Sequence, residues 1–589
     1  MPQLRKTKIV CTLGPAVDEV DRMVELLQAG MNVARFNFSH GTHEEHRKRI
    51  ARLREASRTA DIPVALMIDT KGPEIRTGPL KDDAKVTLNR DDTITITTDE
   101  IEGDGERVSI SYKQLPDEVG PGKHIFVADG LIDLEVTEVS GTEVRCVVRS
   151  GGVLGSRKNV NIPGVRVSLP SMTAKDAADI TFAIENGMDY IAASFIRNAG
   201  NVTEIQDLIA GHESSIRVIA KIEDQEGIDN IDEIIRVSGG IMVARGDLGV
   251  QLSTEDIPLA QKRIIEKCYV QNKPVITATQ MLDSMINNPK PTRAELTDVA
   301  NAIFDGTDAV MLSGETATGK YPIRTVETMH KIAMAVETSD EYRRRCEKYF
   351  DLFGESEDIG HAVAKAAYLV ARETRATAIV APTLRGNTPR HISKFRPPQN
   401  IIAVTTSEQA HRQLLLNWGI FPLLSEHVHD SDLMIQKALR KALHSGYAKR
   451  LDKVVTAAGM PLNSPIPMNT IKVHFMGSIL NRGHKGFGKI CSGRIVHAEG
   501  FEEAAVRLQD DGNEILLTRS LDSRYVPIIR RVRGVILEET SALSPEEIRE
   551  INPEIVYIAE VPNALSTFES NQIVSLDGEE KIIYEGMLD

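Results

Sequence analysis

Eight short apolar segments, each ending in a polar or glycine-containing loop, recur through the first half of this 589-residue chain. In chain order they read KIVCTLGPA, NVARFNFSHG, VALMIDTKGPEIR, YIAASFIR, RVIAKIEDQEG, GIMVARGDLG, PVITATQMLDS and AVMLSGETATG. Amphipathic stretches such as 20–29 and 204–210 lie between most of them. Near-continuous apolar runs that alternate with helices indicate buried parallel strands. Eight such units predict an α/β fold with a (β/α)₈ TIM barrel, in which functional residues follow the carboxyl ends of the strands.

The regular pattern is interrupted once and is followed by two further regions. After the third strand the chain changes to short alternating runs with turn residues, which predict an inserted β-barrel lid over the barrel mouth. From about 358 to 474 a second α/β pattern predicts an open-sheet C domain. The glycine-rich stretch 481–488 is interpreted as a linker to a small extra C-terminal domain. The predicted boundaries are 1–72 and 169–345 for the barrel, 73–168 for the lid, 346–475 for the C domain and 476–589 for the extra domain.

Charge and cysteine content exclude several classes of protein. The formal net charge of −14 argues against nucleic acid or an anionic membrane as the main partner. The five cysteines are far apart and form no CxxC pair, so we expect reduced thiols and neither disulfides nor a zinc site. The amino-terminal segment lacks the apolar region of a signal peptide, and no apolar stretch is long enough to span a bilayer. We therefore expect a cytoplasmic protein.

The strongest chemical signal is KIEDQEG followed by MVARGDLGV. Lys221 and Glu223 are two residues apart on one predicted strand, so their side chains point to the same face. Asp247 follows the next strand, and neighbouring strand ends in a barrel allow Glu223 and Asp247 to share one divalent cation. A lysine beside that cation would stabilise charge on a transferring phosphoryl group. The alternative is a structural Lys–Glu ion pair, which the other polar loops on the same rim disfavour.

A second group of polar residues follows the second and third predicted strands. Arg35, Asn37 and Ser39 alternate along one strand and share a face, and Asp69 and Thr70 end the adjacent strand. Amide, hydroxyl and carboxylate oxygens of this kind suit a hard cation. Arginine guanidinium groups suit phosphate or carboxylate. The glycine-containing loops match neither a P-loop nor GxGxxG, so we predict no nucleotide site of either type.

The order of these motifs resembles the pyruvate kinase family from about residue 6 to about residue 475. The resemblance rests on ARFNFSHG, DTKGPEIRTG, KIEDQEGIDNIDEI, MVARGDLGV, TATQMLDSM and PTRAELTDVANAIFDGTDAVMLSGETATGKYP. It implies a barrel domain, a β-barrel lid, a C domain and a homotetramer. It also implies an enzyme, a phosphotransferase that moves a phosphoryl group from phosphoenolpyruvate to ADP, giving pyruvate and ATP.

The resemblance assigns roles to individual positions of this sequence. The implied catalytic residues are Lys221, Arg35 and Thr279. The implied substrate-binding residues are these three with Ala244, Arg245, Gly246 and Asp247. The implied nucleotide contacts are His40, Arg76, Lys158 and Asn37. The implied ligands of Mg²⁺ (or Mn²⁺) are Glu223 and Asp247, and those of K⁺ are Asn37, Ser39, Asp69 and Thr70. Glu74 stands where potassium-dependent members carry glutamate. In the lid, Ala128 replaces an aspartate of many members, whereas Asp129 is kept.

Two further resemblances concern the carboxyl-terminal half. The predicted strand-to-helix loop with Thr383, Arg385, Gly386, Asn387 and Thr388 lies where regulated members bind a sugar phosphate, and helix amino termini bind phosphate well. The effector could be a hexose bisphosphate, AMP or ribose 5-phosphate; a plain connection is the alternative. The tail from about 480 resembles the mobile phosphohistidine domain of phosphoenolpyruvate-using enzymes and points to a bacterial source. Its stretch LEETSALSPEE contains Ala542 and no histidine, so we expect a packing or interface module.

Two other functions remain open from the sequence. A different metal-dependent barrel enzyme, such as a phosphoenolpyruvate-linked aldolase or lyase, would share the lysine and two carboxylates but would need neither the β insert nor a nucleotide. A metabolite-sensing scaffold without catalysis is disfavoured because every charged member of the predicted site is present. An assay of ADP-dependent pyruvate release, with and without Mg²⁺ and K⁺, separates the three.

Overall fold

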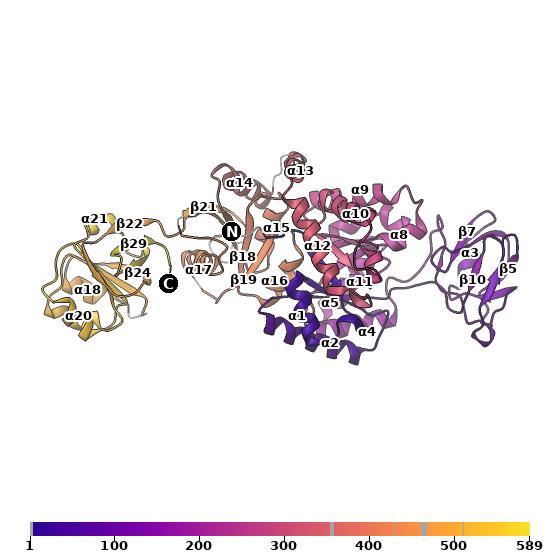
Figure 1. Cartoon of the computed structure of the whole chain (residues 1–589), viewed down its shortest axis with the longest axis horizontal. Coiled ribbons are helices and arrows are strands. Elements are labelled where there is room, and N and C mark those ends of the chain that lie inside the picture. The colour runs from indigo at the N-terminus through magenta and orange to yellow at the C-terminus, as the bar shows by residue number, and fades with distance from the viewer. Residues whose placement is uncertain are drawn as a thin grey trace. The chain divides into compact units, whose positions relative to one another are not determined.

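The predicted barrel strands pair in parallel and close into a ring of eight within the described range 4–353, as expected. Figure 1 shows the whole chain, with this part coloured from indigo to magenta. The computed structural model describes residues 4–353, 358–428, 430–450, 452–460, 468–509 and 512–588, so the ends of the first and last predicted domains (1–3 and 589) lie outside it. The ring contains β1 (Lys8–Thr12), β2 (Val33–Asn37), β3 (Ala65–Asp69), β12 (Tyr190–Ala193), β13 (Arg217–Ile222), β14 (Gly240–Ala244), β15 (Val275–Ala278) and β16 (Ala309–Leu312).

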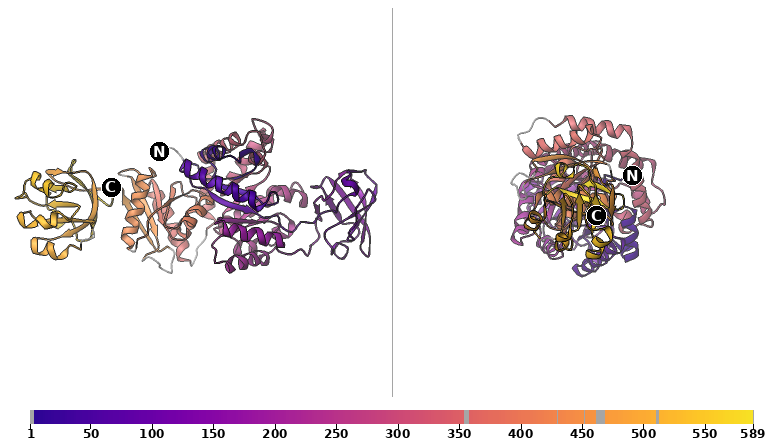
Figure 2. Two further views of the ribbon diagram at one scale, coloured as in Figure 1. Left: turned by 90° about the horizontal axis from the view of Figure 1, so that it is seen from below. Right: turned by 90° about the vertical axis from the view of Figure 1, so that its left-hand side faces the viewer.

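Helices surround the ring (Figure 2), and nearly all residues of its strands are buried. They are α1 (Val20–Ala29), α2 (His43–Ala60), α4 (Ala174–Glu185), α5 (Ala199–Gly211), α6 (Gln225–Asp229), α7 (Ile231–Val237), α8 (Arg245–Gln251), α9 (Ile257–Val270), α10 (Arg293–Phe304), α11 (Gly314–Ala317), α12 (Pro322–Glu337) and α13 (Asp340–Asp351). Capping boxes begin α2, α4 and α10, where a threonine hydroxyl and an acidic side chain satisfy free amide groups. The caps set where these helices begin relative to the preceding loops.

The segment between β3 and α4 forms β-sheets with one short helix. Its elements are β4 (Val86–Leu88), β5 (Thr93–Thr97), β6 (Arg107–Ser109), α3 (Leu115–Glu118), β7 (His124–Val127), β8 (Ile132–Ser140), β9 (Glu143–Ser150), β10 (Gly152–Leu154) and β11 (Val160–Asn161). Within this part of the described chain, one sheet has the order β11-β7-β8-β9-β5-β6, and β10 pairs with β4. The insert has its own apolar core, and two chain segments join it to the barrel (Figures 1 and 2).

Residues 412–419, although distant in sequence, belong to the same compact unit as 3–354. Leu415 and Leu416 of the short 3₁₀ segment Leu414–Leu416 pack with the apolar side chains inside the barrel. The hydroxyl of Tyr190 on β12 donates to the carbonyl oxygen of Gln413. Barrel interiors must be filled by side chains, and here part of the filling comes from the second half of the chain.

The second compact unit comprises 355–411 and 420–589. Its first part has a sheet of order β19-β18-β17-β20-β21 across the described residues between 358 and 475, parallel except for β21. The elements are α14 (Ile359–Glu373), β17 (Ala378–Pro382), α15 (Asn387–Ser393), β18 (Asn400–Thr405), α16 (Glu408–Gln413), β19 (Ile420–Leu424), α17 (Ser431–His444), β20 (Lys453–Ala458) and β21 (Thr470–Phe475). This is the open α/β sheet that the sequence predicts.

The carboxyl-terminal part forms a sheet of order β22-β29-β28-β24-β25-β26-β27-β23 over its described residues. The elements are β22 (Ile479–Arg482), β23 (Lys485–Phe487), β24 (Cys491–His497), α18 (Phe501–Arg507), β25 (Glu514–Thr518), α19 (Val526–Ile529), β26 (Gly534–Leu537), α20 (Pro545–Ile551), β27 (Val556–Ala559), α21 (Ala564–Thr567), β28 (Ile573–Asp577) and β29 (Ile582–Glu585). The sheet mixes parallel and antiparallel pairs.

The interpretation of 481–488 as a linker is wrong, because this stretch contributes to both edge strands of the tail sheet. Only Gly483 and His484 separate β22 from β23, so the two edges of the sheet lie close together. The amide of Gly483 donates to the carbonyl of Lys581 and that of His484 to the carbonyl of Ala559, so each residue continues the pairing of its own edge strand. A Cβ on Gly483 would lie 2.4 Å from a methyl carbon of Ile558, so the glycine permits close backbone packing and does not mark a flexible linker.

All five cysteines lie within the described residues. They form no disulfide with one another, and all but Cys346 are buried. Among the described residues, no helix has both the length and the apolar character that crossing a membrane requires.

Candidate functional site

Lys221 lies at the centre of the polar rim at the carboxyl ends of the barrel strands. Its ammonium group is 2.9 Å from Glu223 Oε1 and 3.0 Å from Asp69 Oδ1, and it donates to Ser194 Oγ at 2.7 Å. Burial opposes the charged form, but the carboxylates of Asp69 and Glu223 outweigh burial and raise the pKa of Lys221. A fixed, buried positive charge therefore faces the mouth of the barrel.

Glu223 and Asp247 are the two carboxylates that the sequence assigns to a divalent cation. Glu223 follows β13 and is buried, and its Oε2 accepts the amide of Phe195 at 2.5 Å. Asp247 lies in the first turn of α8, directly after β14, which pairs with β13. Burial raises the pKa of both carboxyl groups, against the opposing effect of Lys221. Two adjacent carboxylates with this tendency suit a cation that would compensate their charge.

The donor set around these carboxylates is small. Among the described residues, no group of three or more His, Cys, Asp and Glu side chains is arranged to hold a metal ion. Mg²⁺ takes about six oxygen ligands and usually binds proteins through one or two carboxylates, with water and substrate phosphate supplying the rest. Glu223 and Asp247 fit that pattern and do not fit an ion held entirely by protein.

Arg35 and Asp69 form a buried ion pair on adjacent strands. Arg35 Nε donates to Asp69 Oδ2 at 2.6 Å, and its Nη1 donates to Thr12 Oγ1 at 2.9 Å. Asp69 therefore accepts from Arg35 on one oxygen and from Lys221 on the other. Although burial acts in the opposite direction, these two cations lower the pKa of Asp69. The two predicted phosphate-facing cations are thus held together by one carboxylate.

The other predicted K⁺ ligands lie at the end of β2 (Asn37) and in the loops that follow β2 and β3 (Ser39 and Thr70). Asn37 Oδ1 accepts the amide of Ser39 at 3.1 Å, and Ser39 is exposed. Thr70 is buried, and its Oγ1 accepts the amide of Ser194 at 3.2 Å. Because Asn37 is paired in register with Asp69, the two loops leave the barrel side by side. The structure therefore brings the predicted ligands to one edge of the rim.

Thr279 follows β15 with a φ of 66°, a left-handed conformation that is unfavourable for a β-branched residue. Its Oγ1 accepts the amide of Gly246 at 2.7 Å and donates to the carbonyl of Ala278 at 2.6 Å. The guanidinium of Arg245 binds the carbonyl of Thr279 and the carboxylate of Asp298, each within 2.8 Å. The side chain of Arg245 is therefore engaged in holding this loop, and Ala244 ends the buried strand β14 beside it.

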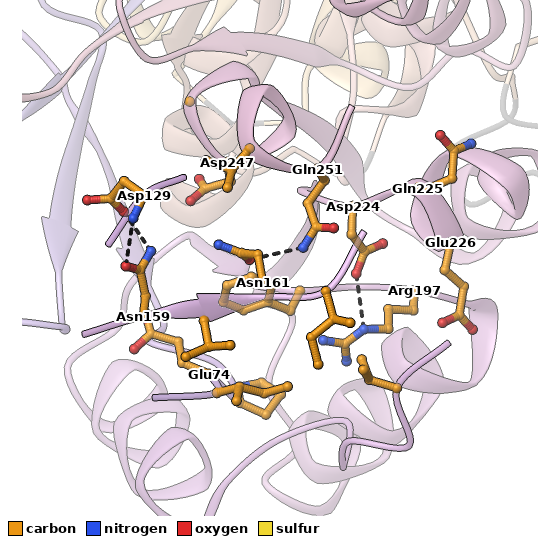
Figure 3. A pocket seen from close by; sticks show the side chains of 18 of the residues that line it. Glu74, Asp129, Asn159, Asn161, Arg197, Asp224, Gln225, Glu226, Asp247 and Gln251 are labelled. Carbon is orange, nitrogen blue, oxygen red and sulfur yellow. Dashed lines mark hydrogen bonds and ion pairs between the residues drawn. The ribbon is translucent and has the colours of Figure 1, made fainter. Parts of the chain in front are cut away.

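A cavity of about 840 Å³ lies between the lid and the barrel rim. Figure 3 shows Asp129, Asn159 and Asn161 of the lid around the same space as Asp247 and Gln251 of the barrel. Asn159 donates to Asp129 Oδ1 at 2.6 Å, and Gln251 donates to Asn161 Oδ1 at 2.9 Å. The second bond joins lid to barrel directly.

Two of the predicted nucleotide contacts, Arg76 and Lys158, lie at the base of the lid, and the other two, Asn37 and His40, lie at the end of β2 and in the loop after it. Arg76 Nε donates to Glu74 Oε2 at 2.7 Å, and the backbone of Arg76 forms an isolated antiparallel β-bridge with that of Asn159. Lys158 is exposed, and its backbone amide donates to Thr77 Oγ1. His40 is also exposed, while its carbonyl accepts from His46 at 2.9 Å. These cationic or potentially cationic side chains are accessible to a charged ligand.

Several residues of the site carry no sequence signal of their own. Phe195 has a φ of 55° and presents its amide to Glu223, whereas Asn161 and Gln251 pair across the lid and barrel. Each contact joins residues far apart in the chain, so no local pattern indicates it. Of the predicted effector positions, Thr383, Arg385 and Gly386 lie in the loop between β17 and α15, and Asn387 and Thr388 begin α15, in the other compact unit.

Comparisons with known proteins agree along the whole chain. Family models described as "Pyruvate kinase, barrel domain", "Pyruvate kinase, alpha/beta domain" and "PEP-utilising enzyme, mobile domain" match residues 4–326, 361–474 and 510–581. The chain is 46% identical to a pyruvate kinase of Geobacillus stearothermophilus and 44% identical to one of Sporosarcina psychrophila, in each case over 99% of both chains. A solved pyruvate kinase from Cryptosporidium parvum is 40% identical, with a TM-score of 0.77, over 80% of this chain and 96% of that one.

Proposed function

Because the chain belongs to the pyruvate kinase family, we propose that the rim around Lys221 is the place where it transfers the phosphoryl group of phosphoenolpyruvate to ADP. The products of this reaction, the last step of glycolysis, are pyruvate and ATP. The observation that carries the assignment is the buried ammonium of Lys221, surrounded by Glu223, Asp69 and Ser194 at the open end of the barrel. A fixed charge of this kind needs no reorganisation when negative charge develops beside it.

Membership of the pyruvate kinase family implies dependence on a divalent metal and on potassium. In this chain, Glu223 and Asp247 would hold Mg²⁺ or Mn²⁺, since they are adjacent carboxylates and burial raises the pKa of both. When bound, the cation would neutralise negative charge on the substrate oxygens during phosphoryl transfer. For K⁺ the candidates are Asn37, Ser39, Asp69 and Thr70, and Glu74 at the base of the lid supports dependence on K⁺.

Lys221 and Arg35 would offset the charge of the transferring phosphoryl group. Asp69 binds both cations and holds their nitrogen atoms on the same side of the rim. Because the ordered pair is already in place, binding energy of the substrate is not needed to assemble it. Ala244, Arg245, Gly246 and Asp247 would flank the substrate carboxylate, with Arg245 acting through the loop that it holds.

Thr279 would orient the water that supplies a proton to the enolate carbon. A hydroxyl group has one donor and two acceptor positions. In Thr279 the donor is used on the carbonyl of Ala278 and one acceptor position by the amide of Gly246. The remaining acceptor position can bind one hydrogen of a water molecule, which leaves the other hydrogen free to point at the substrate.

The nucleotide would lie between the barrel and the lid, in contact with His40, Asn37, Arg76 and Lys158. The accessible side chains of Arg76 and Lys158 at the base of the lid suit phosphate oxygens. The bond between Gln251 and Asn161 supports a lid that can rest on the rim and exclude water during transfer.

The family also implies an oligomeric state, an effector site and a location in the cell. The exposed side chains of Val473 and Phe475 on the edge strand β21 support assembly of copies, and we propose the homotetramer. The loop from Thr383 to Thr388 would bind a sugar phosphate or AMP. A soluble cytoplasmic location fits a glycolytic enzyme.

A coupled assay of pyruvate release tests the proposal for the site. Activity should require ADP and a divalent cation and should rise with K⁺, and Lys221→Met should abolish most of the turnover. Pyruvate release that needs no ADP would instead indicate a lyase. If Lys221→Met has the turnover of the unmodified chain, the rim is not the reaction site.

A further inference from the structure

The lid leaves the barrel and returns to it through two stems that meet at one buried carboxylate. The outgoing stem begins at Gly72, after β3, and the returning stem reaches Thr173, immediately before α4. Asp176, in the first turn of α4, is 1% exposed. It lies between the two stems and contacts both of them.

Each oxygen of Asp176 binds a different stem. Its Oδ1 accepts the amide of Gly72 at 3.0 Å. Its Oδ2 accepts the amide of Thr173 at 2.8 Å and the hydroxyl of Thr173 at 2.7 Å. The contact to Thr173 is the capping box of α4, but the contact to Gly72 spans 104 residues and has no function in capping the helix. The carboxylate therefore links the two ends of the lid insert.

The outgoing stem is packed against the reaction site. Gly72 has a φ of +74°, and a Cβ there would lie 2.8 Å from Ser194 Cβ and 2.9 Å from Phe195 Cδ2. Ser194 accepts from Lys221, and Phe195 donates to Glu223. The base of the outgoing stem therefore lies against residues that contact Lys221 and Glu223.

The same helix also holds the loop that follows β2. Lys175 Nζ donates to the carbonyl of Phe38 at 2.8 Å and to Asp179 Oδ2 at 2.6 Å. Asp179 Oδ1 lies 2.6 Å from His43 Nε2, at the start of α2. The first two turns of α4 therefore contact the loops after β2 and β3 as well as the returning lid stem.

We propose that Asp176 is a positioning residue for phosphoryl transfer. Its carboxylate binds both stems of the lid to the barrel rim, and so sets the position of the lid's nucleotide contacts. This inference rests on the proposed function only for the nucleotide contacts. The proposed phosphoenolpyruvate contacts Lys221, Arg35 and Thr279 all lie on the barrel. Of the proposed nucleotide contacts, Arg76 and Lys158 lie beyond the stems, whereas His40 and Asn37 lie on the barrel. Loss of the tie should therefore affect ADP more than phosphoenolpyruvate.

The test compares Asp176→Ala and Asp176→Asn with Glu547→Gln. Glu547 occupies the same capping-box position in α20 of the tail, in the other compact unit, where it accepts the amide of Ser544 at 2.7 Å. Asp176→Ala should raise the KM for ADP about tenfold, the scale of one or two lost hydrogen bonds to a charged group, with the KM for phosphoenolpyruvate within about twofold. Asp176→Asn keeps one acceptor oxygen, so its KM for ADP should fall between those of Asp176→Ala and the unmodified chain. Glu547→Gln should leave both constants unchanged.

Limited trypsin digestion gives a readout that does not depend on activity. Lys71 directly precedes the outgoing stem and Arg166 lies on the returning stem, and cleavage after both should be about tenfold faster in Asp176→Ala than in the unmodified chain or Glu547→Gln. Equal cleavage rates, or a lower kcat with both KM values unchanged, would overturn the positioning role. Lys221→Met serves as the separate check of the reaction site: if it keeps full turnover, the proposed function fails whatever the stem cleavage shows.

Discussion

Lys221 Nζ lies 2.9 Å from Glu223 Oε1, and both side chains come from one end of β13, two residues apart. The ammonium group is also bound to Asp69 and Ser194, so its position is set on three sides. A cation that is held this firmly can stabilise charge in a transition state without first being ordered. We therefore expect substitutions of Lys221 and Glu223 to have large and separable effects.

Lys221→Met should lower kcat by about 10³, because the lost charge stabilises the transition state more than the bound substrate. The KM for phosphoenolpyruvate should change by less than about threefold. Steady-state kinetics check both numbers. Since the substitution leaves Asp69 and Glu223 with less compensating charge, a thermal melt must accompany the kinetics. A fall in kcat of less than tenfold in a folded variant contradicts the role.

Glu223→Gln should weaken binding of Mn²⁺, used as a probe for Mg²⁺, by at least about tenfold, since even groups that only support a metal ligand have effects of that size. Titration calorimetry on the enzyme without nucleotide measures this directly. The matched control is Glu226→Gln, which also lines the cavity but lies beside Arg166. Equal Mn²⁺ affinity in the two variants would show that Glu223 is not a ligand.

His474 should make the C domain sensitive to mild acid. It is buried on β21 beside Thr456, and burial lowers its pKa from 6.5 to about 4, with a smaller effect from Lys472. Between pH 6.5 and pH 4, His474 binds a proton in the unfolded chain but not in the folded one. Its contribution to the free energy of unfolding is therefore complete above pH 6.5 and is lost as the pH falls toward 4. The loss at pH 5 should be about 2 kcal/mol.

Thermal melts at pH 7 and pH 5 test this difference. His474→Gln should have the smaller pH dependence, whatever its stability at pH 7, because the titrating group is absent. His212→Gln is the control, since His212 is exposed on the barrel. If His474→Gln and the unmodified chain lose equal stability between the two pH values, another group is responsible.

Leu416→Ala should destabilise the barrel by about 2–5 kcal/mol, the range for a deleted buried leucine side chain that leaves a cavity. Leu416 is fully buried among the side chains inside the barrel, although it follows the barrel strands by more than a hundred residues. Leu131→Ala is the matched control, because Leu131 is 71% exposed in the lid. Differential scanning calorimetry should show a lower melting temperature for the first variant only. Equal melting temperatures would mean that 414–416 does not help to fill the barrel.

The sequence predicts the barrel because its evidence is local. Each apolar run is long enough for one buried strand, and each is followed by a helical pattern. The shared face of Lys221 and Glu223 follows from the two-residue period of a strand, and their proximity to Asp247 follows from the order of adjacent strands. The tail can be related to a mobile domain from its sequence. The glycines at 481–488 suggest a linker, but in the structure this stretch contributes to the edge strands β22 and β23.

The amino-acid sequence by itself therefore determined the elements, their order around the barrel and the residue types that meet at its rim. Only the tertiary structure decided which of those groups are bound to each other: Asp69 to both Arg35 and Lys221, and Asp176 to Gly72. It also decided that Leu416 fills the barrel from the second half of the chain. The physical reason is that local pattern reports which face a side chain occupies, whereas these contacts depend on how distant segments pack and pair their buried charges.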